Sequence, residues 1–121
     1  MRYQRLDHRF VIHIPRVLEP GMLYISIEYA TAAHSCCCGC GEEVVTPLTP
    51  TDWKLVFDGE TISLWPSVGN WSYACKSHYV IERNQVIKAL PWSDKRIANA
   101  RIKDKSIKEV FYGIIDQGEA H

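Results

Sequence analysis

The sequence has no long hydrophobic run, no excess charge of either sign and no internal repeat. No stretch of its 121 residues approaches the roughly 18 consecutive apolar residues that a membrane-spanning helix needs. Fourteen Lys and Arg residues balance fourteen Asp and Glu residues, which excludes a generally cationic nucleic-acid coat and an acidic solvating tail. The first ten residues carry charge but no apolar block follows them, so we expect no signal peptide. We therefore predict a soluble cytoplasmic protein without nucleic-acid or membrane partners.

Apolar segments separated by turn signals predict a mainly β protein, a small antiparallel β domain, over residues 1–92. In the segment 22–29, Leu23, Ile25 and Ile27 alternate with polar residues, which is typical of a half-buried strand. Asp58-Gly59 and Arg83-Asn84 are hairpin turn signals. The predicted strands are 9–14, 22–29, 44–45, 53–57, 62–65, 79–82 and 85–89, with an irregular turn at 66–70.

Residues 93–121 differ in character from the rest of the chain. Isolated apolar residues stand among Lys and Arg, and the helical stripe that they form is weak. We expect a charged helix or tail as a second segment after the β domain.

The five cysteines are clustered. Four lie in His34-Ser-Cys-Cys-Cys-Gly-Cys-Gly41 and the fifth is Cys75. An odd number without a secretion signal argues against a disulfide framework. One alternative is that the cysteines are buried and act as small hydrophobic residues. Another is a redox pair, Cys37-x-x-Cys40, but the βαβ context of thioredoxin-like motifs is missing. The pattern favours a metal site.

Zinc prefers tetrahedral sets of thiolates and imidazoles. Candidate ligands lie in two segments far apart in the sequence, the cysteine loop and Cys75-Lys-Ser-His78. A metal ion bound by both segments would close a long loop. Two ligand sets are possible. We favour Cys38, Cys40, Cys75 and His78, and the alternative is Cys36, Cys38, Cys40 and Cys75, which frees His78. A structural zinc is favoured, although Glu42 and Glu43 keep a catalytic zinc open.

Ser67 is the candidate nucleophile. It lies in Pro66-Ser-Val-Gly-Asn70, where a Pro- and Gly-bounded turn can expose a hydroxyl and neighbouring N–H groups. His34 could act as its general base, as a metal ligand or as a hydrogen-bonded loop residue. Asp52 could orient a histidine or serve only in a turn.

Several blocks together resemble a family of small bacterial proteins of unknown function with a CGCG core. The resemblance covers about residues 10–90 and rests on the cysteine loop, Val45-Thr-Pro-Leu48, Asp52-Trp53, Leu64–Trp71 and Cys75-Lys-Ser-His-Tyr79. Members of that family can be encoded beside ubiquitin-activating-like, ubiquitin-conjugating-like and ubiquitin-like proteins. The position of Cys37 looks variable in the family, and Trp65 stands where a smaller residue is expected.

The resemblance implies a part in a bacterial ubiquitin-like conjugation pathway, as a peptidase that trims or removes the ubiquitin-like protein. In this hypothesis Ser67 attacks the carbonyl after a terminal glycine, and His34 takes its proton. N–H groups near Gly69 and Asn70 hold the oxyanion, and a structural zinc pins the loops. The alternative is a non-enzymatic, zinc-stabilised module that binds the ubiquitin-like protein or its conjugation enzymes. A zinc hydrolase, in which the metal activates water, is a third possibility.

Overall fold

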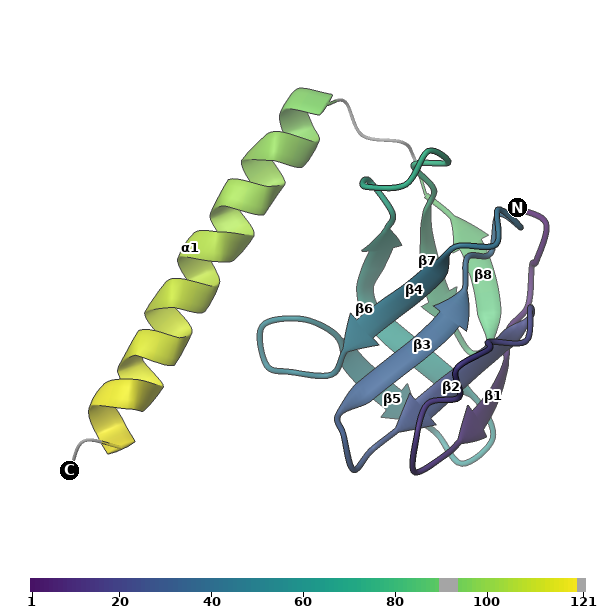
Figure 1. The fold of residues 1–121 in the computed structure, drawn as a ribbon, viewed down its shortest axis with the longest axis horizontal. Coiled ribbons are helices and arrows are strands. Elements are labelled where there is room, and N and C mark those ends of the chain that lie inside the picture. Colours follow the sequence, from purple (N-terminus) through teal and green to yellow (C-terminus); the bar gives the residue numbers. More distant parts are fainter. Residues whose placement is uncertain (90–93, 120–121) are drawn as a thin grey trace. The chain divides into compact units, whose positions relative to one another are not determined.

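The computed structural model describes residues 1–89 and 94–119, and it shows a mainly β fold followed by a helix (Figure 1). The mainly β prediction is confirmed. In the described residues, the strands form two four-stranded sheets. The elements are β1 (Asp7–Phe10), β2 (Met22–Ser26), β3 (Thr31–Ser35), β4 (Glu43–Pro47), β5 (Lys54–Phe57), β6 (Ile62–Gly69), β7 (His78–Glu82), β8 (Gln85–Lys88) and α1 (Asp94–Glu119).

The first sheet has the order β1-β2-β3-β4. Its β2–β3 and β3–β4 pairs are antiparallel, but β1 pairs with β2 in parallel, from Asp7↔Met22 to Phe10↔Ile25. Two parallel strands need a connection that brings the chain back to the end of the sheet where the first strand began, and residues 11–21 form this connection. The β domain is therefore mostly antiparallel, as the sequence predicts, with one parallel strand pair at the edge of the first sheet.

Strand β2 is buried on both faces, in contrast to the half-buried strand expected for it. Leu23 and Ile25 enter the main core, and Tyr24 packs with Leu18 and Ala33 in a second cluster. The Tyr24 hydroxyl accepts a hydrogen bond from the Glu19 N–H at 3.2 Å. The connection after β1 thus covers a face that the alternating pattern had assigned to solvent.

The second sheet has the order β5-β6-β7-β8 and is antiparallel throughout. Both predicted hairpins are confirmed, since β5 pairs with β6 around residues 58–61 and β7 pairs with β8 around residues 83–84. Arg83 and Asn84 both have positive φ, as a two-residue type I′ turn requires. The Asn84 side chain reaches across the core and donates to the Leu6 carbonyl at 2.6 Å.

The main core lies between the two sheets. It consists of buried side chains from both sheets and from the segments beside them, namely Leu6, Leu23, Ile25, Ala32, Cys36, Cys37, Val44, Ile62, Leu64, Val68, Tyr79, Ile81 and Val86. The N-terminal segment joins the sheets through backbone bonds, from Tyr3 N–H to the Cys37 carbonyl and from Val86 N–H to the Gln4 carbonyl. The N-terminal segment thus connects the cysteine loop with strand β8.

The chain divides into two compact units, Met1–Pro91 and Trp92–His121. Helix α1 makes up most of the second unit; residues 93 and 120–121 of the predicted tail lie outside the described residues. On its exposed surface, Lys108 pairs with Asp104 at 3.3 Å, one turn away. Among the described residues, no helix is long and apolar enough to cross a membrane.

Candidate active site and metal centre

Ser67 lies in a β-bulge of β6. Leu64 pairs with Ile81 and Val68 pairs with Tyr79, so three residues of β6, Trp65–Ser67, stand opposite a single residue of β7. A bulge of this kind bends a strand and redirects its side chains. Ser67 remains half-buried, between exposed Pro66 and buried Val68. The predicted irregular turn at 66–70 is thus an irregular stretch of strand up to Gly69.

His78 is the histidine that contacts Ser67. It begins β7 and pairs with Gly69, two residues beyond Ser67, so both side chains lie on the same face of the sheet. The His78 Nε2 atom is 2.8 Å from Ser67 Oγ. This distance is within the reach that proton transfer between a serine and a base requires, about 2.6–3.2 Å. The pair is a serine–histidine dyad, here called the Ser67–His78 dyad.

The His78 ring is held by an aromatic contact. Trp71 meets it edge-on with ring centroids 4.9 Å apart. The same indole lies over Gly69, where an added Cβ would come within 2.6 Å of its ring atoms. The absence of a side chain at residue 69 therefore leaves the space in which Trp71 packs beside His78.

His34, which the sequence offered as the base, lies elsewhere. It is fully buried on β3, and its Nε2 is 2.6 Å from the Tyr79 hydroxyl. Burial lowers the pKa of His34 from 6.5 to about 4, so its imidazole is neutral at pH 7. Its Nδ1 has no hydrogen-bond partner among the described residues. The structure thus places His78, and not His34, at the serine.

Four cysteines converge at one point. The sulfur atoms of Cys36, Cys38, Cys40 and Cys75 all lie within 4.8 Å of one another. We call this group the thiol cluster. It corresponds to the alternative ligand set; in place of the favoured His78, the structure brings Cys36 to the other three sulfurs. Gly39 and Gly41, with φ of 87° and 85°, let the loop fold tightly, and the Cys36 N–H donates to the Glu42 carbonyl at 2.8 Å.

The thiol cluster fits a tetrahedral metal ion. With metal–sulfur bonds of about 2.3 Å, the sulfurs of a tetrahedral zinc site stand about 3.8 Å apart. The observed separations are 3.4 Å for Cys36–Cys38, 3.9 Å for Cys36–Cys75 and 3.8 Å for Cys40–Cys75. Four close thiols could therefore bind a metal ion with no large rearrangement.

Cys37 is separate from the thiol cluster. Its side chain is buried in the main core, and burial raises its pKa to about 12, so the thiol stays protonated at neutral pH. Cys75 behaves differently. Burial raises the pKa of the Cys75 thiol, but hydrogen bonds from Ser77 and from neighbouring thiols together outweigh burial. The net result is a pKa lowered from 9.0 to about 7. A thiol near this value loses its proton readily to a metal.

The cleft on one side of His78 is basic. It has a volume of about 370 Å³, and Arg2, Lys76 and Lys88 line it together with Cys38 and Cys75. Arg2 also packs over Gly39 of the cysteine loop. Four thiolates around a divalent ion carry a net charge of −2, which these cations would partly offset.

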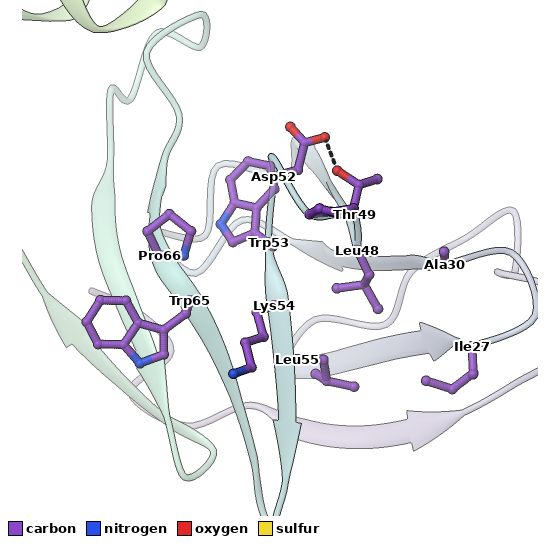
Figure 2. A pocket seen from close by; sticks show the side chains of 11 residues that line it. Ile27, Ala30, Leu48, Thr49, Asp52, Trp53, Lys54, Leu55, Trp65 and Pro66 are labelled. Carbon is purple, nitrogen blue, oxygen red and sulfur yellow. Dashed lines mark hydrogen bonds between the residues drawn. The ribbon is translucent and has the colours of Figure 1, made fainter. Parts of the chain in front are cut away.

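A second hollow adjoins the strand that carries Ser67. This apolar groove has a volume of about 630 Å³ and includes Trp65 and Pro66, the two residues before Ser67 (Figure 2). Asp52, considered above as a partner for a histidine, lies in this groove and accepts a hydrogen bond from Thr49 Oγ1 at 2.7 Å. The other lining residues are Ile27, Ala30, Leu48, Pro50, Trp53, Lys54 and Leu55.

Comparison with known proteins identifies the family. The model of the family described as "Bacterial ubiquitination-like system serine protease (BubE)" matches residues 10–89. The chain belongs to the BubE family. This match confirms the resemblance seen in the sequence and connects the chain with a bacterial ubiquitination-like system. No curated protein and no solved structure matches the chain.

The span shared with the BubE family contains both the Ser67–His78 dyad and the thiol cluster. Sequence reasoning had named all of these residues but had assigned the base to His34. The signal that could have pointed to His78 is its place directly after Cys75-Lys-Ser, because a strand starting there can pair with the Ser67–Gly69 segment. The hydrogen bonds from the Asn70 side chain to Ser77, Tyr79 and Cys36 were not foreseen from the sequence.

Proposed function

We propose that this chain is a serine peptidase that processes or removes the ubiquitin-like protein of a bacterial ubiquitination-like system. The observation that carries the proposal is the 2.8 Å contact between Ser67 Oγ and His78 Nε2. Membership of a family described as serine proteases of such a system supports the same reaction class and the same partner. His78 takes the role of general base that the sequence hypothesis gave to His34.

The proposed reaction passes through an acyl-enzyme. His78 Nε2 accepts the hydroxyl proton of Ser67 as its oxygen attacks the carbonyl carbon of the scissile bond. The leaving amine then takes that proton from His78 as the bond to the carbonyl carbon breaks. Water hydrolyses the acyl-enzyme by the same transfers in reverse, which releases the new carboxylate and restores Ser67. Nε2 must be unprotonated at the start, and the hydrogen bond from Ser67 is compatible with that tautomer.

The developing oxyanion needs N–H donors that are not already used. The Asn70 N–H donates to the Ser77 carbonyl at 2.8 Å and is therefore engaged in the ladder. Alternation along an antiparallel pair turns the Gly69 N–H away from β7. We therefore assign the oxyanion contact to the Gly69 N–H and not to the Asn70 N–H.

The thiol cluster would hold a structural zinc ion with Cys36, Cys38, Cys40 and Cys75 as ligands. Bound zinc would supply folding energy by fixing the cysteine loop to Cys75, three residues before His78, where β7 begins. Four protein ligands leave no open position for water, which argues against the zinc hydrolase.

A cleavage assay tests the proposal. The substrate is a ubiquitin-like protein from such a bacterial system with a short extension after its terminal glycine, and mass spectrometry follows release of the extension. Ser67→Ala and His78→Gln should each lower kcat/KM at least about 10³-fold. Ser63→Ala, at the other serine of β6, should keep the wild-type rate. Wild-type turnover by Ser67→Ala would refute the mechanism.

A binding module is the second candidate, and the apolar groove beside Trp65 favours it. Trp65 is 66% exposed, which is unusual for so large an apolar side chain. If the wild-type chain binds the ubiquitin-like protein or a conjugation enzyme and cleaves none of the offered substrates, the module is the better description. Trp65→Ala should then weaken binding, whereas Ser67→Ala should not.

A further inference from the structure

A buried chain of polar side chains connects the thiol cluster with the strands of the dyad. We call it the Asn70 network; its members are Asn70, Ser77, Tyr79, His34 and the Cys36 sulfur. All five residues are at least nine-tenths buried. Buried polar groups without partners destabilise a core by about 1–3 kcal/mol each, so a set of this size calls for a reason.

Asn70 stands at the centre of this network. Its side-chain Nδ2 lies 2.9 Å from Ser77 Oγ, 3.4 Å from the Tyr79 hydroxyl and 3.5 Å from the Cys36 sulfur. Its backbone N–H also donates to the Ser77 carbonyl at 2.8 Å. Asn70 thus binds Ser77 through both its backbone and its side chain.

The direction of these bonds orients the Ser77 hydroxyl. Because Asn70 Nδ2 can only donate, Ser77 Oγ accepts from it and its own proton is directed elsewhere. The Cys36 sulfur, at 3.2 Å, is an available acceptor, whereas the Cys75 thiol, at 3.4 Å, donates to Ser77 Oγ in its protonated form. Ser77 is therefore set to donate a hydrogen bond to a thiolate of the cluster.

The same two residues adjoin the dyad. Ser77 directly precedes His78, the first residue of β7, and Asn70 follows Gly69, the residue that pairs with His78. A shift of Asn70 against Ser77 would move this pair and, with it, His78 Nε2 relative to Ser67 Oγ. The Asn70–Ser77 contact therefore affects both the distance between Ser67 Oγ and His78 Nε2 and the environment of the thiolates.

We infer that Asn70 is a positioning residue that couples the two sites: with Ser77 it donates hydrogen bonds to the thiolates of the metal cluster, and it fixes the strand pair that carries the Ser67–His78 dyad. The coupling to the dyad rests on the proposed peptidase function, whereas the contact with the thiolates does not. Hydrogen-bond donors around metal ligands tune affinity by about 10- to 100-fold in other sites.

The test compares Asn70→Ala and Ser77→Ala with Asn84→Ala in the full chain. Asn84 is a matched control, since it is an equally buried asparagine whose side chain bonds Leu6 and Ile62 away from the cluster. Each protein is loaded with Co²⁺, whose sulfur-to-metal charge-transfer bands report on thiolate ligands, and zinc affinity is measured by competition with a chelator.

We expect Asn70→Ala and Ser77→Ala to shift the cobalt bands and to weaken zinc binding about 10- to 100-fold. Asn84→Ala should lower thermal stability but leave the bands and the affinity of the folded protein unchanged. Wild-type bands and affinity in Asn70→Ala, or no metal uptake by the wild-type chain, would overturn the inference. If Asn70→Ala does not fold, Ser77→Ala removes a single hydroxyl and decides the question.

Peptidase kinetics separate this inference from the proposed function. Asn70→Ala should lower kcat at least about 10-fold with little change in KM, because the residue sets the dyad distance and not the substrate contacts. An unchanged kcat together with shifted cobalt bands would remove the coupling to the dyad. If the wild-type chain cleaves nothing, the peptidase proposal fails, and the metal measurements still decide the role of Asn70 at the thiolates.

Discussion

At the scale of single residues, the dyad depends on a missing side chain. Gly69 lies opposite His78, and the Trp71 indole occupies the space where a Cβ would stand. Gly69→Ala should displace Trp71 and loosen the His78 ring, which would lower kcat about 10- to 100-fold with the fold retained. Cleavage kinetics and circular dichroism measure the two effects.

A double variant provides the control for this prediction. Trp71→Leu removes the obstructing ring, so the effects of Gly69→Ala and Trp71→Leu should be strongly non-additive. Additive losses in the double variant would show that the two residues act separately.

His34 should make the fold sensitive to acid. The folded state keeps its imidazole neutral down to about pH 4, whereas the unfolded chain takes up this proton below 6.5. The unfolded state thus binds more protons below pH 6.5, and stability falls as the pH drops from 6.5 towards 4, by about 3 kcal/mol at most. Denaturant unfolding at pH 7 and pH 5 measures this loss.

His34→Gln isolates the contribution of His34. Protonation of the thiol cluster destabilises both proteins in acid, but only the wild-type chain has the buried imidazole. The fall in unfolding free energy between pH 7 and pH 5 should therefore be smaller in His34→Gln. Equal losses in the two proteins would contradict the prediction.

At the scale of elements, the thiol cluster ties the cysteine loop to the entry of β7. We predict one zinc ion per chain by elemental analysis of native protein. Cys38→Ser or Cys75→Ser should lose the metal and unfold or strongly destabilise the β domain, because structural zinc sites contribute on the order of 10 kcal/mol of binding free energy to folding.

Cys37 offers the matched control for the ligand variants. It lies in the same loop, but its side chain packs in the main core and not in the cluster. Cys37→Ala should lower the melting temperature modestly and retain one zinc ion per chain. Loss of zinc in Cys37→Ala, or its retention in Cys75→Ser, would invalidate the ligand set.

At the scale of the whole molecule, we propose that the two segments expected from the sequence, 1–92 and 93–121, are separate domains. The main core is built from the first unit, and the family match ends at residue 89. A chain ending at residue 92 should keep its zinc ion and melt within a few degrees of the full chain. Circular dichroism melting and metal analysis test this, and loss of the cooperative transition would show that 93–121 is needed for folding.

The sequence alone determined the parts of this protein that depend on local chemistry. Turn residues at 58–59 and 83–84 specified two hairpins, because positive φ and tight reversal are properties of a few residues. Clustered thiols beside glycines indicated a loop that could hold a metal ion, and short blocks such as Cys75–Tyr79 were enough to indicate the family.

Tertiary structure alone decided which groups meet. Strand β3, Thr-Ala-Ala-His-Ser, carries little pattern of its own and is defined by pairing with β2 and β4. His34 and His78 both lie near candidate ligands in the sequence. In the structure His34 is buried in the core, whereas pairing with Gly69 brings His78 to Ser67. Register between distant strands fixes such contacts, and it depends on the packing of both sheets, which local sequence patterns do not contain.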